Sequence, residues 1–491
     1  MEHTSTPATQ LMTYRGILGD RRLDGRADAL VAALVATRTV SIAALAADWA
    51  EQIAFYRLLA NDALTTERLA EGLTAWTATL PEGGDTGEGA PRRHLLLIQD
   101  TTEVSFEAHR GRIQPRSGLG WLSNNRTHGF CLHPTLVVDA QTEHALGFAD
   151  VQAWARPTEV PPPAVPYRDR PIEQKESFRW ITATHAAAAR LGPDVALTIV
   201  ADREADIYSL FARRAATDAV VRVCRDRRLA GGEKLYAHLS SRPVLGEQTV
   251  WLRGDLRRGD AAGRWARLEY RAAAVEITRP ERSARPDADG QRDPCSLALW
   301  AVEIAERDAP AGTAPVLWRL LTSHDAGTFD ASCRVCTWYR QRWHRAGVRP
   351  PEQVFRALKQ DGLGLEASEL ETGTGLTRLG LLALGAALEV SRLLLAERGV
   401  SSGHIGDVFD TAEQACLAAL NVQVEGATAK QRNPHGATTL AWAAWVIARL
   451  GGWKGYASQH RAGPATYHRG LRRFHDLNAG WHLAHRDLYK P

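Results

Sequence analysis

The sequence predicts a mixed α+β protein in which a strand-rich core lies between helical segments. Two short apolar runs, 95–98 and 197–201, are too short for helices and therefore indicate buried strands. Short segments of β propensity, separated by Gly, Asp and Pro, fill residues 220–323. Apolar residues recur at helical spacing near both ends of the chain. The 491 residues are enough for two or three domains.

The first predicted domain comprises residues 1–80. Residues 24–76 are rich in Ala and Leu at three- and four-residue spacing, which favours a small helical unit, and a helix-start signal at 61–66 divides it. The following residues, 81–92, carry Gly, Pro and acids without periodicity, as is typical of a linker. A domain boundary is therefore expected near residue 80.

The second domain, 81–370, holds the strands and contains a mostly β insertion at about 220–323. The third, 371–491, returns to helical periodicity, with strongly apolar helices near 376–398 and 439–450. The first of these contains charged residues that are costly in a bilayer, so it is interpreted as a buried helix and no membrane segment is expected.

Charge and cysteine content indicate which partners and which cellular compartment to expect. A formal net charge of +4, from 60 basic and 56 acidic residues, does not by itself indicate a polyanionic partner. Basic residues do concentrate in 332–359 and in the C-terminal tail, where local positive potential is expected. Six widely spaced cysteines and the lack of a signal-peptide pattern favour reduced thiols and a cytoplasmic protein.

Three acidic residues form the candidate catalytic site. Asp100 and Asp202 each follow a predicted buried strand, and Glu352 lies in a cationic, helix-like segment. Carboxylates that converge on one point require neutralising cations, so the trio predicts a divalent metal. Strand-end aspartates also cap turns and helices, which is an equally good interpretation of either aspartate alone. Asp206 is expected at the surface or just behind the site.

A second constellation surrounds the glutamate. Tyr339, Arg342, Glu352 and Lys359 mix aromatic and basic groups, which suits a phosphate-lined ligand, although a solvated helix face is the simpler interpretation of the segment alone. Glu352 and Lys359 are seven residues apart and so share one helix face. Cys333 and Cys336 lack a second pair at zinc-finger spacing, and buried thiols are favoured over a zinc site.

Several segments together resemble the insertion sequence 4 family of bacterial cut-and-paste DDE transposases, and most closely the transposon-five transposase branch. The resemblance spans nearly the whole chain and lies in residues 19–22, 99–102, 175–177 with Trp180, 201–206, 318–323, Tyr339 with 342–343, and 447–452. It implies a ribonuclease-H-like core interrupted by the β insertion, an N-terminal helical DNA-binding domain and a C-terminal helical domain for dimerisation and DNA contacts.

The resemblance also implies residue roles. Asp100, Asp202 and Glu352 correspond to the metal-binding acidic triad, which holds two Mg²⁺ ions that Mn²⁺ can replace. Residues implied to contact DNA are Tyr339, Arg342 and Lys359 of the Tyr-Arg-Glu-Lys signature, Trp318 beneath a flipped base, and Arg21, Arg22 and Arg57 of the N-terminal domain. The implied partners are double-stranded DNA with terminal inverted repeats, target DNA and a second copy of the chain, in a nucleoid-associated setting.

One departure from the family pattern keeps other functions open. Nine residues separate Arg342 from Glu352, more than is usual in the family, and they include Pro350 and Pro351, which a helix tolerates in its first turn. Glu366 and Glu369 are fallback acids. The alternatives are a catalytically impaired DNA-binding inhibitor of transposition and another metal-dependent DNA nuclease on the same core.

Overall fold

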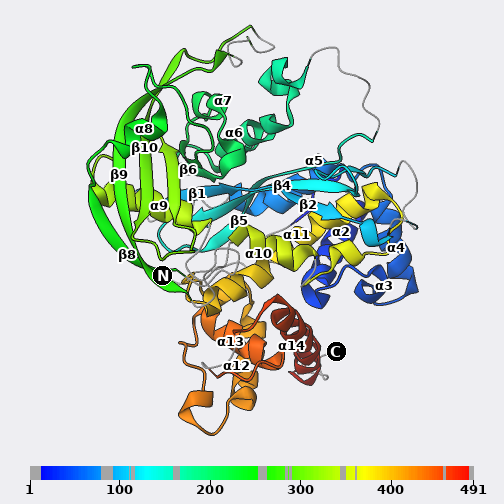
Figure 1. The fold of residues 1–491 in the computed structure, drawn as a ribbon. Coiled ribbons are helices and arrows are strands. Elements are labelled where there is room, and N and C mark those ends of the chain that lie inside the picture. Colours follow the sequence, from blue (N-terminus) through cyan, green and yellow to red (C-terminus); the bar gives the residue numbers. More distant parts are fainter. Residues whose placement is uncertain are drawn as a thin grey trace.

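The computed structural model describes residues 13–78, 92–109, 111, 117–158, 166–252, 263–281, 286, 290–342, 350–359, 362–456 and 461–485. Within these residues the strands form one 11-stranded mixed sheet, with helices at both ends of the chain, so the predicted mixed α+β class is confirmed. Figure 1 shows the helices beside and below this sheet.

The centre of the sheet is a mixture of parallel and antiparallel strands. β1 (His94–Gln99) pairs antiparallel with β4 (His128–Asp139) and parallel with β6 (Ala196–Ala201). Outside these, β5 (Ala145–Trp154) pairs antiparallel with β4, and β7 (Asp218–Arg222) pairs parallel with β6. The short strands β2 (Thr102–Ser105) and β3 (Gly120–Trp121) also pair with β4. The carboxyl ends of β1, β6 and β7 therefore share one edge of the sheet.

The predicted β insertion continues this same sheet. Its strands are β8 (Gly246–Leu252), β9 (Arg264–Thr278), β10 (Ser296–Arg307) and β11 (Leu317–Thr322). β11 pairs antiparallel with β7, which joins the two halves of the sheet. The apolar runs at 268–270 and 275–277 belong to one long strand, β9, because β10 pairs with it along nearly its whole length.

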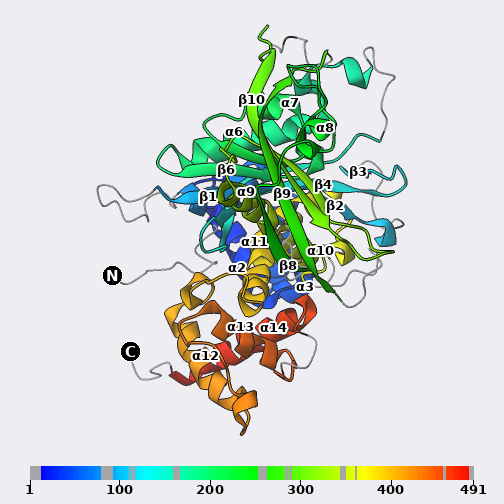
Figure 2. The ribbon, with the colours of Figure 1, turned by 60° about the vertical axis from the view of Figure 1, so that its left-hand side comes forward.

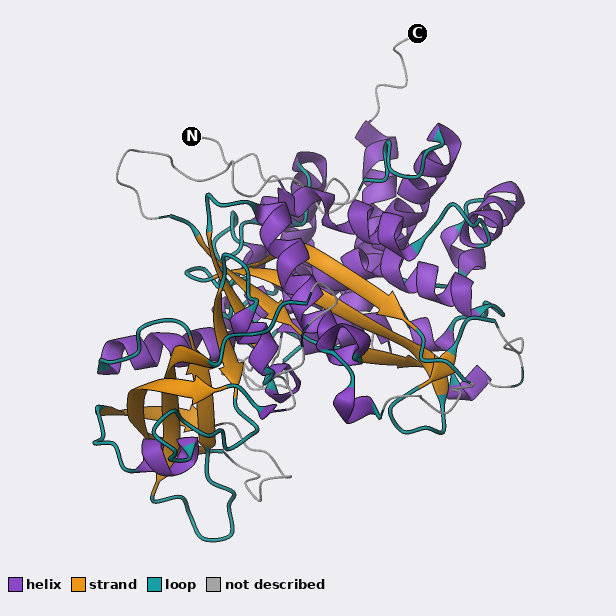
Figure 3. Cartoon of the chain, turned by 90° about the horizontal axis from the view of Figure 1, so that it is seen from above, coloured by secondary structure: helices purple, strands orange, loops and turns teal. Residues whose placement is uncertain are grey.

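Helices cover both faces of the central strands, and alternate side chains of β1 enter different cores. Leu95 and Leu97 pack in one cluster with residues of α6 (Arg179–Leu191). Leu96 and Ile98 enter the largest cluster, which contains the apolar residues of α11 (Gly373–Glu397). A strand buried on both faces reads as a continuous apolar run, which explains its sequence. Figure 3 shows helices on either side of the strands.

The N-terminal unit is helical, as predicted. It contains α2 (Arg21–Thr37), α3 (Ile42–Leu45), α4 (Trp49–Leu59) and α5 (Thr66–Thr74). The helix-start signal at 61–66 is confirmed, since the Thr65 side chain accepts a hydrogen bond from the Arg68 N–H and caps α5.

Helix α11 is the common support of the N-terminal and C-terminal helices. It packs against α2 and α5 on one side and against the later helices α13 and α14 on another. By length and composition α11 could cross a membrane, and among the described residues it is the one helix of this kind. Its most apolar stretch is entirely buried inside the protein. Buried Arg38, which follows α2, forms an ion pair with Glu389 of α11. The prediction of a buried helix near 376–398 is thus confirmed.

The C-terminal helices form a cluster below the sheet in Figures 1 and 2. They are α12 (Thr411–Val424), α13 (Leu440–Leu450) and α14 (Pro464–His485). The predicted apolar helix at 439–450 corresponds to α13. His468 of α14 contacts the Arg38 carbonyl, so the C-terminal cluster reaches the end of α2.

Candidate active site

Asp100 and Asp202 come together because β1 and β6 are neighbouring parallel strands. Ile98 pairs with Val200 in their register, and each aspartate follows two residues later, where its strand has ended. Carboxyl ends of parallel strands are where ligand sites form in such sheets. The sequence located both aspartates at strand ends, and the strand register places them at the same point of one edge.

Arg342 bridges the two carboxylates. It ends α9 (Phe329–Gln341), and its Nη2 lies 2.7 Å from Asp100 Oδ1 while Nη1 lies 3.2 Å from Asp202 Oδ2. The arginine side chain is 5% exposed, whereas the aspartate side chains are 28% and 29% exposed. The guanidinium therefore closes the site from inside, and the carboxylates face outward.

Burial and the neighbouring charges perturb the ionisation of this group. Burial raises the pKa of Asp100, Arg342 lowers it and Asp202 raises it, with a net increase. Burial lowers the pKa of Arg342, but the two aspartates outweigh this effect and raise it. Adjacent like charges disfavour joint ionisation unless a cation compensates them. The site is thus a pair of acids held next to each other by one fixed cation.

Glu352 lies in the first turn of α10 (Pro350–Lys359), with Pro350 and Pro351 at the helix start as expected. Its side chain is partly exposed, and α10 packs against α11. Residues 343–349, which connect Arg342 to this helix, lie outside the described residues. Within the described part of the chain, no group of three or more His, Cys, Asp and Glu side chains lies close enough to hold a metal ion.

The other end of α10 approaches the strand that follows Asp100. Lys359 Nζ donates a hydrogen bond of 3.0 Å to the Glu103 carbonyl of β2 (Thr102–Ser105). The fallback acid Glu366 accepts a hydrogen bond of 3.1 Å from the Ser105 N–H, whereas Glu369 is exposed. Lys359 and Glu366 therefore border the same strand, and both line an open cavity beside it.

Tyr339 and Trp318 contact each other. Their ring centroids are 5.3 Å apart in an edge-to-face arrangement. Tyr339 is fully buried in the main core, and Trp318 of β11 packs partly buried against that core. In this conformation the Tyr339 ring is covered by protein, so only Trp318 of the pair presents part of its surface.

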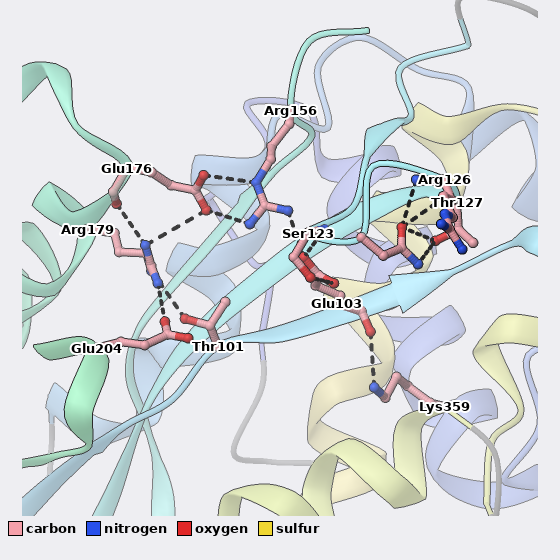
Figure 4. A network of polar contacts seen from close by, with 11 residues as sticks. Thr101, Glu103, Ser123, Arg126, Thr127, Arg156, Glu176, Arg179, Glu204 and Lys359 are labelled. Carbon is pink, nitrogen blue, oxygen red and sulfur yellow. Dashed lines mark hydrogen bonds and ion pairs between the residues drawn. The ribbon is translucent and has the colours of Figure 1, made fainter. Parts of the chain in front are cut away.

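A network of polar contacts beside the aspartates joins the turns that follow them (Figure 4). Arg179, in the first turn of α6, donates from Nε to Thr101 Oγ1 at 3.2 Å and from Nη2 to Glu204 Oε2 at 2.8 Å. Thr101 directly follows Asp100. Glu204 stands two residues after Asp202, and its N–H donates to Asp202 Oδ1 at 2.9 Å. One arginine therefore ties the two aspartate-bearing turns together.

The network extends along the surface through a second arginine. Arg156 Nη1 lies 2.7 Å from Glu103 Oε1, and its Nε and Nη2 donate to the two carboxylate oxygens of Glu176 at 2.9 and 2.8 Å. The open cavity has a volume of about 550 Å³. Its lining includes Arg156, Glu103, Glu204 and Lys359, which are labelled in Figure 4. Because both acids and bases line it, the cavity offers contacts to both donors and acceptors.

His133 lies buried beneath the network in strand β4. Its Nδ1 is 2.9 Å from Thr101 Oγ1, and its ring packs edge-to-face against Trp180 at 4.6 Å. Burial, followed by the charges of Arg179 and Arg342, lowers its pKa well below the ordinary value. A histidine that stays neutral here orients Thr101. His133 was not among the residues predicted for the site, although a histidine inside an apolar strand is a signal of a buried polar role.

Asp206 was expected at the surface or just behind the site, and the surface alternative is wrong. It is 2% exposed and forms a buried ion pair with Arg227. Its Oδ2 also accepts hydrogen bonds from the N–H groups of Cys224 and Arg225. The helical pattern after Asp202 did not reveal this, because the partners follow the next strand. Asp206 thus fastens the turn after β6 to the segment after β7.

Cys333 and Cys336 were predicted to be buried thiols, and burial is found for Cys336, whereas Cys333 is partly exposed. Cys333 and Cys336 form no disulfide, and Cys336 is buried. Burial raises the pKa of Cys336 to about 11, so the thiol is protonated at neutral pH.

The N-terminal arginines predicted to contact DNA are exposed. Arg21 and Arg22 begin α2, and Arg57 lies near the end of α4. All three fall within residues 17–64, which match the family described as transposase DNA-binding. The match indicates a DNA-binding transposase. It covers the N-terminal helices only, so DNA binding by a transposase is the part of the predicted function that it supports.

Proposed function

We propose that this protein is a cut-and-paste DNA transposase of the DDE type, resembling the insertion sequence 4 family, in which Asp100, Asp202 and Glu352 hold Mg²⁺ for cleavage and transfer of DNA strands. One observation carries the proposal. Two carboxylates stand side by side at the ends of neighbouring parallel strands, in a chain whose N-terminal residues match a transposase DNA-binding family. A structural role alone would not require paired acids facing solvent over a buried arginine.

The order of strands supports a ribonuclease-H-like core. β5, β4 and β1 follow one another antiparallel, and β6 and β7 extend the sheet parallel to β1. In this arrangement the first and fourth strands of the unit, β1 and β6, are adjacent, as an acidic pair at one edge requires. The strands β8–β11 then constitute the addition to the core that the resemblance implies.

The donor set suits a hard divalent cation. Carboxylate oxygens are preferred ligands of Mg²⁺ and Mn²⁺. Asp100 and Asp202 would contribute one oxygen ligand or more each. Among the described residues Glu352 forms no metal-holding cluster with them, so it would complete the set only after α10 moves towards the two strand ends. When bound, two such ions activate a nucleophile and stabilise the leaving oxygen of a phosphodiester.

The remaining side chains hold the site and neutralise charge. Arg342 compensates the paired carboxylates, and Arg179 with His133 fixes the turn that carries Asp100. Lys359 supplies a cation at the edge of the adjoining cavity. Preorganised charge of this kind lowers the free energy of a transition state that gains negative charge.

The DNA partners follow from the same hypothesis. The exposed arginines of residues 17–64 would bind the terminal inverted repeats of the element, and target DNA would enter at the Asp100/Asp202 edge after cleavage. A second copy of the chain, bound through the C-terminal helices, would pair the two ends.

The test is cleavage of a linear duplex that carries the DNA flanking the gene, with Mg²⁺ or Mn²⁺ and with EDTA. Strand cleavage at a defined position by the wild type, lost in Asp202→Asn while binding of the duplex persists, is expected. Asp218→Asn, at an aspartate of β7 whose side chain is 48% exposed, is the matched control. Equal cleavage by wild type and Asp202→Asn would refute the assignment, and cleavage restricted to branched DNA would indicate a nuclease of another class.

A second function, a DNA-binding inhibitor of transposition, has one observation in its favour. Arg342 already pairs with both aspartates, so a metal ion must share those carboxylates with a guanidinium. Binding of the duplex without cleavage in either metal, together with reduced cleavage by an active transposase added to the same reaction, would select this function.

A further inference from the structure

A second pocket opens at the same edge of the sheet as the two aspartates. It has a volume of about 410 Å³ and lies between the segment before α6, the turn after β6 and the segment after β7. Glu204, whose N–H donates to Asp202, lies in the wall of this pocket. The pocket therefore adjoins the candidate active site on the side of Asp202.

Cations dominate the described lining of the pocket. Basic side chains lining it are Arg170, Lys175, Arg213, Arg225 and Arg227, whereas the acidic ones are Glu173, Glu204 and Asp293. Arg213 pairs with Glu173 and Asp293, and Glu204 pairs with Arg179. Arg227 in turn pairs with Asp206. With the partners Arg179 and Asp206 included, six basic side chains stand against four acidic ones, so basic groups remain in excess.

Tyr167, which is 54% exposed, stands at the mouth of the pocket. The Arg170 guanidinium lies 5.8 Å from the ring centroid and the Lys175 ammonium 6.0 Å from it. An exposed aromatic face flanked by two cations can stack a planar base while the cations meet the adjoining phosphates. Arg225, exposed on the segment after β7, adds a further cation to the lining.

We propose that this pocket binds one unpaired DNA strand next to the Asp100/Asp202 site, with a base on Tyr167 and phosphates at Arg225 and at the cations beside the ring. The inference rests on the proposed function, because DNA cleavage at Asp100 and Asp202 is the reason to expect a DNA strand at this pocket. A duplex keeps its base faces stacked internally, whereas a single strand offers a face to an aromatic ring. The pocket is also of nucleotide scale rather than a groove wide enough for a helix.

Binding without cleavage tests the proposal. The full-length protein in EDTA is titrated into a fluorescein-labelled oligothymidylate, and anisotropy gives Kd at several salt concentrations. Tyr167→Ala is expected to weaken binding about tenfold, the effect of losing one base stack, whereas Tyr167→Phe, which keeps the ring, retains wild-type affinity. Arg225→Ala should lower the slope of log K against log salt by about 0.7, the contribution of one phosphate on a single strand.

Arg242→Ala is the matched control, because Arg242 is exposed and lies outside the described lining. It should bind like the wild type. A strand containing iododeoxyuridine should cross-link to Tyr167 on irradiation, and mass spectrometry of the peptide containing residue 167 reads this directly. Thermal melting of each variant checks that the fold is retained, as expected for two exposed side chains.

Wild-type affinity in both Tyr167→Ala and Arg225→Ala would overturn the inference. So would a reduction of affinity in Arg242→Ala as large as that in the two pocket variants, or an RNA strand that displaces the DNA strand more effectively than DNA itself. A mononucleotide that competes as well as the oligonucleotide would also overturn it and assign the pocket to a small ligand. If the duplex is not cleaved but binding of the single strand still depends on Tyr167, the result would contradict the proposed function and would still support this binding site.

Discussion

Arg342 Nη2 lies 2.7 Å from Asp100 Oδ1, and through Nη1 the same guanidinium also contacts Asp202. One buried cation therefore joins the ends of two neighbouring strands. The two carboxylates face outward and share their compensating charge, so the stability of the fold and the chemistry of the edge depend on the same side chain.

Replacing Arg342 by Met should destabilise the protein in a pH-dependent way. The pKa of Asp100 is already raised above its ordinary value of 3.8, first by burial, and loss of the cation raises it further. A carboxyl with a raised pKa in the folded state binds its proton more tightly there, so stability falls as pH rises through that raised pKa. We expect a loss of about 1–3 kcal/mol at neutral pH, after allowing for the exposure of the carboxylates, that shrinks in acid.

Urea unfolding of wild type and Arg342→Met at several pH values measures this effect. Asp100→Asn in the Arg342→Met background is the control, because removing one of the two carboxylate charges that have lost their cation should restore part of the stability at neutral pH. A loss of stability that is the same at every pH would show that Arg342 acts through packing rather than through charge.

Removing the hydroxyl of Thr101 should impair cleavage more than DNA binding. Thr101 connects Asp100 to Arg179 and His133, so Thr101→Ala frees the turn that carries the carboxylate. Thr101→Ser keeps the hydroxyl and is the matched control. We expect a fall in the cleavage rate of roughly tenfold or more for Ala, with Ser near wild type and duplex affinity unchanged in both.

Single-turnover cleavage and anisotropy titrations separate these quantities. If the Thr101→Ala variant cleaves at the wild-type rate, the network does not position the Asp100 carboxylate for cleavage. Parallel loss of affinity in both variants would point to a fault in folding.

The buried pair of Arg38 and Glu389 should contribute to the attachment of α2 to α11. Their side chains are 4% and 2% exposed, so removing one charge leaves the other unpaired in the core. We expect Glu389→Gln to cost about 3–5 kcal/mol, and the double variant Arg38→Met/Glu389→Leu to cost less than the single one. Denaturant unfolding of the wild type and the variants gives the comparison, and a double variant worse than Glu389→Gln would contradict it.

The exposed arginines of the N-terminal helices should set the salt dependence of duplex binding. Replacing Arg22 or Arg57 by Ala should weaken binding and reduce the slope of log K against log salt by about 0.9 for each phosphate that the removed guanidinium neutralised. Arg242→Ala, outside residues 17–64, is the control. The measurement is a duplex titration across salt concentrations, and an unchanged slope in both variants would exclude these side chains from the interface.

Local patterns were sufficient for the elements near the site. Apolar runs bounded by polar residues located β1 and β6, and each run placed an aspartate where its strand ends. The seven-residue step from Glu352 to Lys359 and the two prolines predicted α10 correctly. These features depend on propensity and periodicity within a few residues, which a single sequence contains.

The contacts that make the site depend on distant parts of the chain. Arg342 contacts both aspartates although it follows Asp100 by 242 residues and Asp202 by 140 residues in the chain. Arg179, His133 and Arg227 likewise acquire their roles through pairing of strands that the sequence does not specify locally. The strand β9 is long because β10 pairs with it along nearly its whole length.

The sequence by itself therefore determined the strands, the helices and the acids that their ends carry. Tertiary structure decided which strands are neighbours, and hence that Asp100 and Asp202 meet at one edge over Arg342. The physical reason is that secondary structure follows from short-range periodicity, whereas strand register and the burial of charges such as Asp206 follow from partners supplied by the whole fold.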